Sequence, residues 1–418
     1  MNSSFSDSRR ALLRKLSLLP LPLVGNVPTI SLAAEANTEN FLSIQVNGGW
    51  DISCFCDPKE NIGGEKIITK WSLEDVTQEE GNIRYAPFAK NDIFFKKHYQ
   101  KMLVVNGVDT QTNAHETGVM VSYTGRHAEG LPCFSALHAL IYGGTLPLPY
   151  VAFNSSASFT ENAISILQAQ ADSIIQISDS SFNNRIDQDI LNEIEGLHAK
   201  NSYNMSNETG VLPINIQKRM QFYQSVKNAD RLPELLQFLP SVEEIQSLPD
   251  LKRQILVSLA LFKAGLTSTV DIGHGGYDSH TNNDSTQQTL LSELTDSINY
   301  LWDQAEIMGI KDDLFLMVGS DFSRTPYYNS GNGKDHHPSG SYIFMKENAN
   351  FTNKTIGSTD QLQNPIGVDE KTLNSDGSGI LLLPGHIQQS LRKYFGVDLT
   401  IFNEQFPLKV ESDIYIFS

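Results

Sequence analysis

The chain has 418 residues, of which 40% are hydrophobic and 19% are charged, and its formal net charge is −17. These are values of a globular protein that buries a large core, so a wholly disordered chain is excluded. No cluster of lysine or arginine occurs outside the N-terminus, which argues against nucleic acid or an anionic membrane surface as a partner. An anionic substrate is still allowed, because a local arginine or a bound cation sets the field of a site.

The N-terminus predicts an export signal. Residues 8–15 are basic and contain paired arginines, a short apolar run follows, and residues 34–36 (Ala-Glu-Ala) offer a small-residue cleavage site. The apolar run is broken by Pro20 and Pro22 and is too short to span a bilayer. We therefore expect residues 1–36 to be a twin-arginine-type signal peptide that engages the export machinery, which would make the mature protein periplasmic or secreted. A basic start on a cytosolic protein is the alternative.

Apolar strands that alternate with helices predict an α/β domain. Such strands pair in parallel, and the helices cover both faces of the sheet. Strands are expected at residues 41–49, 101–108, 148–153, 266–273 and 313–320, and amphipathic helices at 251–265, 286–308 and 386–395. Residues 155–235 are predicted to be a helical insertion, with helical periodicity at 161–174 and 185–200, and residues 346–378 a polar loop.

The three cysteines, Cys54, Cys56 and Cys133, are too few for a disulfide framework in a chain of this size. In an oxidising compartment Cys133 could pair with Cys54 or with Cys56, which would leave one thiol free. The C-x-C spacing by itself is a poor signal for a metal site.

Four polar segments follow predicted strands, and ligands of parallel sheets bind beyond the carboxyl ends of the strands. The segments are residues 48–51, 109–118, 274–280 and 320–337, and the last three hold five of the ten histidines. Asp and His together are ligands for zinc or manganese, whereas carboxylates alone suit calcium or magnesium. In an extended stretch Asp278 and His280 face the same side and could bind one ion together. The pattern predicts a metal site, with a shared structural hydrogen-bond network as the alternative.

The motifs in these segments resemble those of the DUF1501 family. They are GGWD (48–51), NGVDTQTNAHETG (106–118), GGYDSH (275–280) and SDFSRTPYYNSGNGKDHHP (320–338). Proteins of this family often carry twin-arginine signals and are grouped with the alkaline-phosphatase-like superfamily of phosphatases and sulfatases. The resemblance implies an alkaline-phosphatase-like fold over residues 37–418. It also implies divalent metal ions that hold a phosphoryl or sulfuryl oxygen and lower the pKa of a hydroxyl nucleophile.

The resemblance also implies roles for single residues. The implied metal ligands are Asp51, Asp278, His280, Asp321 and His336. The identity of the ion stays open among zinc, calcium, magnesium and manganese. Phe322 stands where many members of the superfamily have a histidine, so one metal site would lose a nitrogen ligand.

The implied catalytic residues are Thr112, His115 and Arg324. The nucleophile is expected just beyond strand 101–108, where Thr112 is the first choice, and Thr110 and Thr117 are alternatives. Arg324 is expected to clamp substrate oxygens, since a guanidinium binds oxyanions with two parallel hydrogen bonds.

The expected function is therefore metal-dependent hydrolysis of an anionic phosphate or sulfate ester by an exported protein. A non-catalytic binding or assembly protein of the same fold is the alternative, and Phe322 together with the lack of an unambiguous nucleophile favours it. A third possibility is a carbohydrate-surface protein whose helical insertion binds polymer.

Overall fold

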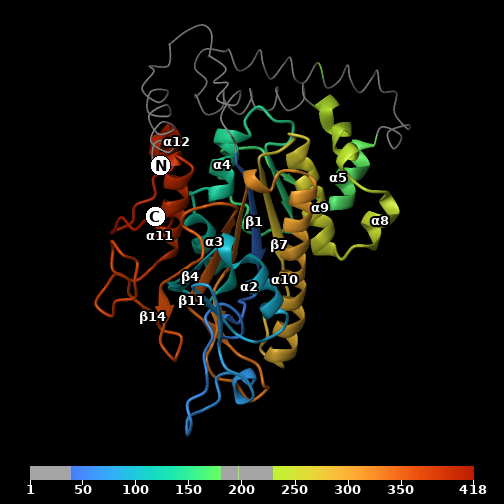
Figure 1. Cartoon of the computed structure of the whole chain (residues 1–418). Helices are drawn as coiled ribbons and strands as arrows, with labels where there is room; N and C mark the ends of the chain where they lie inside the picture. Colours follow the sequence, from blue (N-terminus) through green and yellow to red (C-terminus); the bar gives the residue numbers. More distant parts are fainter. Residues whose placement is uncertain (1–38, 180–195, 197–228) are drawn as a thin grey trace.

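The computed structural model describes residues 39–179, 196 and 229–418 (Figure 1). The predicted signal peptide (1–36) and, apart from residue 196, the helical pattern at 185–200 lie outside the described residues. Within the described part of the chain, none of the helices combines the length and the apolar character needed to cross a membrane.

An eight-stranded sheet forms the centre of the molecule, with the strand order β12-β4-β11-β8-β1-β7-β5-β6. The paired strands run parallel to one another except β11, which is antiparallel to both of its neighbours. The strands are β1 Asn40–Val46, β4 Met102–Asp109, β5 Tyr150–Phe153, β6 Leu167–Gln168, β7 Thr269–His274, β8 Leu314–Ser320, β11 Ser339–Lys346 and β12 Lys354–Ile356. This confirms the predicted α/β class with a mostly parallel sheet.

Alternate side chains of the strands enter two hydrophobic clusters, one on each side of the sheet. In β1, Leu42 and Ile44 belong to one cluster and Phe41 to the other, as the two-residue period of a strand requires. Both faces are covered by helices, as predicted, and such covered sheets bury nearly all of their apolar side chains.

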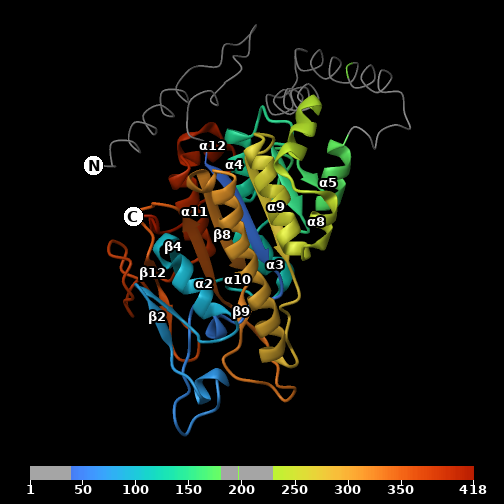
Figure 2. The same cartoon turned by 45° about the vertical axis from the view of Figure 1, so that its right-hand side comes forward.

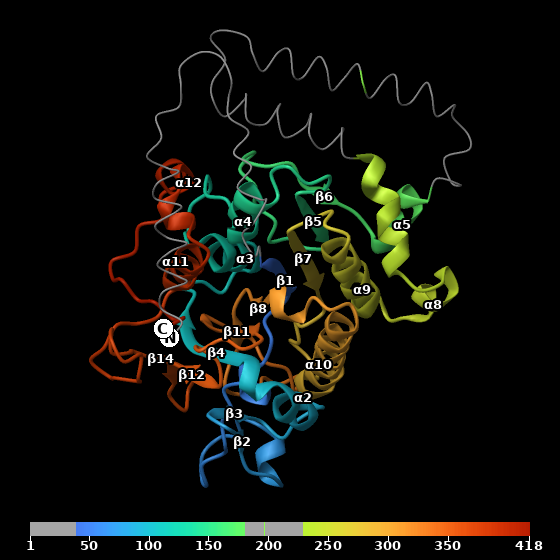
Figure 3. The ribbon, with the colours of Figure 1, turned by 45° about the horizontal axis from the view of Figure 1, so that its top comes forward.

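The helices fall into two groups, one for each face. The first face is covered by α2 (Asn91–His98), α9 (Asp250–Lys263) and α10 (Asn283–Ile307), of which α9 and α10 lie in front in Figure 2. The second face is covered by α3 (His115–Thr124), α4 (Phe134–Tyr142) and α11 (Pro384–Tyr394), which lie on the other side of the strands in Figure 3. The three helices predicted at 251–265, 286–308 and 386–395 are thus confirmed as α9, α10 and α11.

Two predicted segments differ in the structure. The polar loop predicted at 346–378 contains β12, which extends one edge of the central sheet, and a hairpin of β13 (Ser358–Thr359) and β14 (Pro365–Ile366). The helix predicted at 161–174 begins only at Ala171, as α5 (Ala171–Ser178), because Leu167–Gln168 pairs with β5. In both places the backbone bonds that an open sheet edge offers override the local pattern.

The three cysteines are free and buried, so the suggested pairing of Cys133 is wrong. Cys54 and Cys56 belong to the first hydrophobic cluster and Cys133 to the second. The sheet separates them, which keeps their sulfur atoms out of bonding range. Burial raises the pKa of the Cys133 thiol to about 12, so it stays protonated at neutral pH.

One carboxylate, Asp271 on β7, is fully buried among hydroxyl groups. Ser135 donates a hydrogen bond to it at 2.6 Å, and the hydroxyls of Tyr150 and Ser158 also donate to it. Burial nevertheless dominates and raises the pKa of Asp271 to about 6 from an ordinary value of 3.8.

Replacing this carboxylate should change how stability depends on pH. Because the folded-state pKa lies above the unfolded value, the folded protein binds a proton more tightly than the unfolded chain. The resulting stabilisation is complete below the unfolded pKa and is lost as the pH rises through the folded pKa. Between about pH 5 and 7.5 the loss is roughly 1 kcal/mol of unfolding free energy.

In Asp271→Asn this loss should vanish, which urea unfolding at the two pH values measures. The exposed Asp75→Asn is the control, and an Asp271→Asn slope equal to that of the wild type would contradict the assignment.

Candidate metal centre

The four predicted segments meet at one edge of the sheet. Strands β8, β1 and β7 are parallel neighbours, and Val46 pairs with both Ser320 and His274 at their carboxyl ends. The loops that follow these strands therefore start side by side, and the loop after β4 brings the first residue of α3, His115, to the same edge. The structure thus brings together the segments that the strand-end rule placed at one edge.

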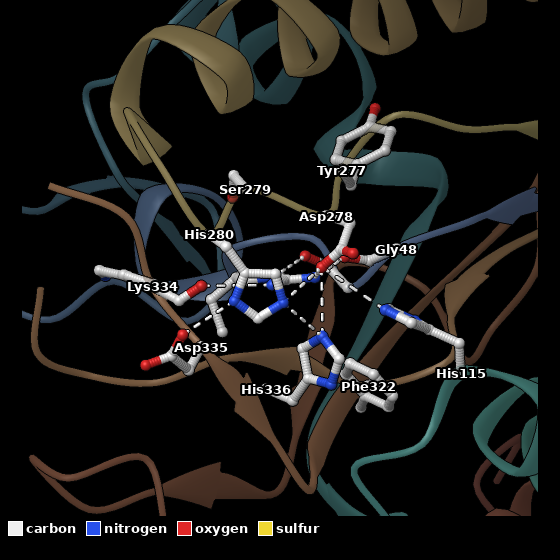
Figure 4. Close-up of polar contacts among 12 residues, drawn as sticks. Gly48, His115, Tyr277, Asp278, Ser279, His280, Phe322, Lys334, Asp335 and His336 are labelled. Atoms are coloured by element: carbon white, nitrogen blue, oxygen red, sulfur yellow. Dashed lines mark hydrogen bonds and ion pairs between the residues drawn. The ribbon is translucent and has the colours of Figure 1, made fainter. Parts of the chain in front are cut away.

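At this edge His115, Asp278 and His336 each place one ligand-type atom within 4.8 Å of the others. Asp278 Oδ1 lies 3.5 Å from His115 Nε2 and 3.1 Å from His336 Nε2. The same oxygen lies 3.1 Å from Nε2 of His280, which stands on the opposite side of Asp278 from His115 (Figure 4). Three imidazole nitrogens from three segments of the chain therefore surround one carboxylate oxygen.

The second nitrogen of each imidazole is held by an oxygen that can only accept a hydrogen bond. The three Nδ1 contacts are His115 to Asp321 Oδ2 at 2.5 Å, His280 to Asp335 Oδ1 at 2.8 Å and His336 to the Asn113 carbonyl at 2.7 Å. Each Nδ1 therefore carries a proton. In a neutral ring Nε2 then offers a lone pair toward Asp278, whereas in a protonated ring it donates to that carboxylate. Imidazoles that bind metal ions are oriented in this way.

This arrangement fits a divalent ion. Nε2 of His115 is buried and has no hydrogen-bond partner in the described structure. Nε2 of His280 and Nε2 of His336 face each other at 3.0 Å. A cation between these atoms would relieve the repulsion among lone pairs and carboxylate. A set of imidazole nitrogens with one carboxylate suits zinc or manganese better than calcium or magnesium, which prefer oxygen ligands.

The backbone at Gly48 brings the loops after β1 and β7 together. Gly48 has φ +107°, and a Cβ atom there would lie 2.6 Å from the backbone nitrogen of Asp278. Only glycine tolerates both this conformation and this close approach. Asp278 thereby reaches the middle of the cluster.

Arg324 contacts Asp278 from the buried side of the cluster. Its side chain is fully buried, and its guanidinium donates to the carbonyls of Gly48 and Gly49 and, at 2.9 Å, to Asp278 Oδ1. A further N–H donates to the carbonyl of Lys334 at 3.2 Å. Protein oxygens therefore already use the donors that a clamp on substrate oxygens would need, so this arrangement does not support the expected role of Arg324.

Asp321 supports His115 and is not placed as a direct metal ligand. Its Oδ2 atom accepts from His115, while Oδ1 accepts from the backbone of Gly49 at 2.8 Å and from the hydroxyl of Ser320 at 2.8 Å. The side chain is buried, and protein donors engage both oxygens. The ring of the next residue, Phe322, stacks on His115 and also packs against His336, which fixes the planes of both imidazoles.

Asp51 is likewise not brought to the cluster. Its Oδ2 atom lies 2.7 Å from the ammonium of Lys334, and both side chains are fully buried. Ser53 and Asn283 donate further hydrogen bonds to this carboxylate at 2.5 and 2.8 Å. Burial by itself would raise the pKa of Asp51, but the charge of Lys334 outweighs it, so the pKa is lowered and the carboxylate stays ionised. Lysine thus occupies the place where a metal ion was expected.

The threonines of the loop after β4 lie beside the cluster. The Thr112 hydroxyl accepts a hydrogen bond from the Ala114 backbone at 3.2 Å, and the side chain is partly buried. Thr110 is buried and donates to the Thr112 carbonyl. Between Thr112 and Ala114 lies Asn113, whose carbonyl orients His336, so this loop forms one wall of the site.

Some residues of the site were assigned no role or a different one from sequence. His115 was expected to be catalytic and is instead a candidate ligand, and Asp335, Asn113 and Phe322 support the imidazoles. A signal for His115 was its position at the first residue after a strand-end loop. The supporting role of Asn113 rests on a backbone carbonyl, which no side-chain pattern reveals.

The cluster is accessible from solvent. The side chains of Asp278 and His280 are 47% and 46% exposed. The hydrogen bond to Asp321 raises the pKa of His115. Partial burial opposes ionisation of Asp278, but hydrogen bonds from His336 and Arg324 lower its pKa below the ordinary value. An ionised carboxylate open to solvent can accept a metal ion and leaves room for a further ligand.

The fold and the cluster define an α/β protein with an open histidine–aspartate site at the carboxyl ends of a mostly parallel sheet. The model of the family described as "Protein of unknown function (DUF1501)" matches residues 177–370. This match agrees with the resemblance of the motifs to that family. No curated protein matches it.

Several solved structures are remotely similar to this chain. The lipoteichoic acid synthase LtaP from Listeria monocytogenes is 9% identical, with 98% of this chain and 80% of that chain covered and a TM-score of 0.35. The alkaline phosphatase from the Antarctic bacterium TAB5 is 11% identical, with 76% and 94% covered and a TM-score of 0.33. The PsFucS1 sulfatase from Pseudoalteromonas sp. is 9% identical, with 86% and 69% covered and a TM-score of 0.34. No residue role is carried over from so remote a similarity.

Removing one orienting carboxylate should weaken metal binding. In Asp335→Asn the acceptor for His280 Nδ1 is lost or replaced by a weaker one, so His280 no longer keeps its Nε2 lone pair aimed at Asp278. We expect zinc affinity to fall roughly ten- to hundred-fold, measured by competition with a chromogenic chelator. Asp303→Asn, which removes a carboxylate paired with Lys97, is the control and should bind zinc like the wild type. Equal affinity in the two variants would remove His280 from the metal site.

Proposed function

We propose that this protein is an exported, metal-dependent hydrolase of phosphate or sulfate esters. The observation that carries the proposal is the convergence of three imidazole Nε2 atoms on Asp278 Oδ1, with every Nδ1 fixed by an acceptor and the cluster open to solvent. His115, Asp278 and His336 would hold one ion, and His280 would complete its ligand set. The donor set favours zinc or manganese.

When bound, such an ion would polarise an ester oxygen and lower the pKa of a hydroxyl nucleophile. The chain supplies the geometry around it. Arg324 holds Asp278 in place, and Asp321 and Asp335 keep two imidazoles in the tautomer that exposes Nε2. These contacts exist before any substrate arrives, so little reorganisation is needed on binding.

Thr112 remains the proposed nucleophile. Its oxygen accepts the Ala114 N–H, which leaves its own proton free to be given up to solvent or to a base. In the proposed reaction the Thr112 oxygen attacks phosphorus or sulfur, the ester oxygen leaves and takes up a proton, and water then releases the bound group. The loop position of Thr112 next to Asn113 supports the choice, since Asn113 contacts His336.

A non-catalytic metal-binding or assembly protein is the second candidate. The observation that favours it is the burial of Arg324, which removes the cation expected to face substrate oxygens. In this case the ion would stabilise the loops at the carboxyl ends of the strands or a contact with a partner, and Thr112 would only shape a turn.

Metal content and turnover together test the proposal. The mature protein, purified without chelators, should contain about one zinc or manganese ion per chain and should cleave nitrophenyl phosphate or nitrophenyl sulfate. His336→Asn should lose both ion and turnover, because a ligand is removed. Thr112→Ala should keep the ion and lose turnover by at least about a hundred-fold. His127→Asn, an exposed histidine, is the control.

The outcomes separate the two candidates. An ion retained without turnover, unchanged in Thr112→Ala, would favour the assembly protein. Absence of bound metal even after soaking with zinc, manganese, calcium or magnesium would overturn the metal centre itself. The export part of the proposal rests on the paired arginines and predicts a mature N-terminus near residue 37 in the periplasmic or culture fraction.

A further inference from the structure

A buried ion pair lies beneath the metal centre. Lys334 Nζ and Asp51 Oδ2 are 2.7 Å apart, and neither side chain is exposed to solvent. Lys334 immediately precedes Asp335 and His336 in the chain, and it also donates to the Ser53 hydroxyl at 3.1 Å. No part of the proposed mechanism uses this pair directly.

Stability alone explains the pair poorly. Removing two charges from water costs several kcal/mol for each ion, and the attraction between them offsets this only when the geometry is good. Well-packed apolar side chains of similar size often serve as well or better. The reason for the pair must therefore be sought in what it connects.

The pair joins the loop after β1 to two of the three loops that carry candidate ligands, those of Asp278 and His336. The backbone N–H of Lys334 donates to the Ser279 carbonyl at 3.0 Å, and Ser279 lies between Asp278 and His280. On the other side, the Asp51 N–H donates to Gln287 Oε1 at 3.0 Å. Gln287 Nε2 in turn donates to the hydroxyl of Ser279 at 3.1 Å. The positions of both ligand loops are thus set by one buried polar layer.

We infer that the Lys334–Asp51 pair is a positioning device for the metal centre. It holds the 275–280 loop and the 333–337 turn at the separation at which His280 and His336 meet at Asp278. The Lys334 ammonium also neutralises Asp51, so Asp51 is not a ligand of the ion. The ligands are His115, Asp278, His280 and His336. The inference rests on the metal centre of the proposed function, but not on the hydrolytic activity.

The chain contains a matched pair for comparison. Lys59 and Asp57 are also buried and lie 2.8 Å apart. Their other contacts are with Thr359, where the Lys59 ammonium donates to the carbonyl and the Thr359 hydroxyl donates to Asp57. This pair shares the chemistry of Lys334–Asp51. Within the described residues its side chains make no hydrogen bond to the loops that carry the candidate ligands.

Two double variants test the inference. Asp51→Leu with Lys334→Met, and Asp57→Leu with Lys59→Met, each replace a buried pair with apolar side chains. Zinc affinity is measured by chelator competition, and stability by urea unfolding of the metal-free proteins. We expect the Asp51/Lys334 variant to bind zinc roughly ten- to hundred-fold more weakly and the Asp57/Lys59 variant to bind like the wild type, at similar stability. An Asp51/Lys334 variant with wild-type affinity, or an equal loss in both variants, would overturn the positioning role.

Milder substitutions keep the test valid if an apolar pair does not fold. Asp51→Asn with Lys334→Gln retains neutral hydrogen bonds, which are about half as strong as charged ones, so a loss of roughly three- to ten-fold in zinc affinity is expected. Asp57→Asn with Lys59→Gln should leave affinity unchanged, and no difference between these variants would also overturn the role. A wild-type protein that binds no zinc would instead refute the metal centre. A wild type that binds zinc without any turnover would refute only the hydrolase.

Discussion

One contact organises the loops at the carboxyl ends of the strands, which we call the rim of the sheet. Three imidazole Nε2 atoms there face a single ionised carboxylate oxygen. Asp278 Oδ1 has Nε2 atoms of His115, His280 and His336 at 3.5, 3.1 and 3.1 Å. Without a proton or a cation among them these atoms repel one another. Arg324 offsets part of the carboxylate charge, and each Nδ1 atom is bound to its own acceptor, which fixes the three rings around Asp278. A proton or a metal ion among these atoms would stabilise the arrangement.

Most other features of the rim keep this contact in place. Gly48 permits the close approach of the loops after β1 and β7, and Arg324 ties the same two loops together through carbonyls and Asp278. Phe322 sets the planes of two imidazoles. Phe322, which stands where the resemblance implies a histidine, therefore packs against two imidazoles and offers no nitrogen ligand. A second nitrogen ligand at this place would serve a second ion, and the carboxylate for that ion, Asp51, is already paired with Lys334.

The sequence predicted the location of the site better than the role of each residue in it. Parallel strands bring their carboxyl ends together whatever the side chains are, so strand-end residues such as Asp278 and Asp321 could be placed at one edge from pattern alone. Whether a carboxylate there binds an ion, a lysine or an imidazole depends on side chains distant in sequence. Asp51 and Lys334 are 283 positions apart in the sequence, and no local pattern links them. The burial of Arg324 has the same origin, since its acceptors are carbonyls of the loop after β1. The pattern missed short segments that complete a sheet edge, such as Leu167–Gln168, and also the interior strand β11.

Charge balance connects the candidate ion to the rest of the rim. Four carboxylates gather there, those of Asp51, Asp278, Asp321 and Asp335, against two fixed cations, Arg324 and Lys334. Two negative charges are left over, in a protein whose net charge is already −17. Protonated histidines or a bound cation could supply the difference. One divalent ion removes the excess, whereas two would leave the rim with a surplus of positive charge. The number of acids and the two buried cations therefore favour a single ion at Asp278, independently of any catalytic role.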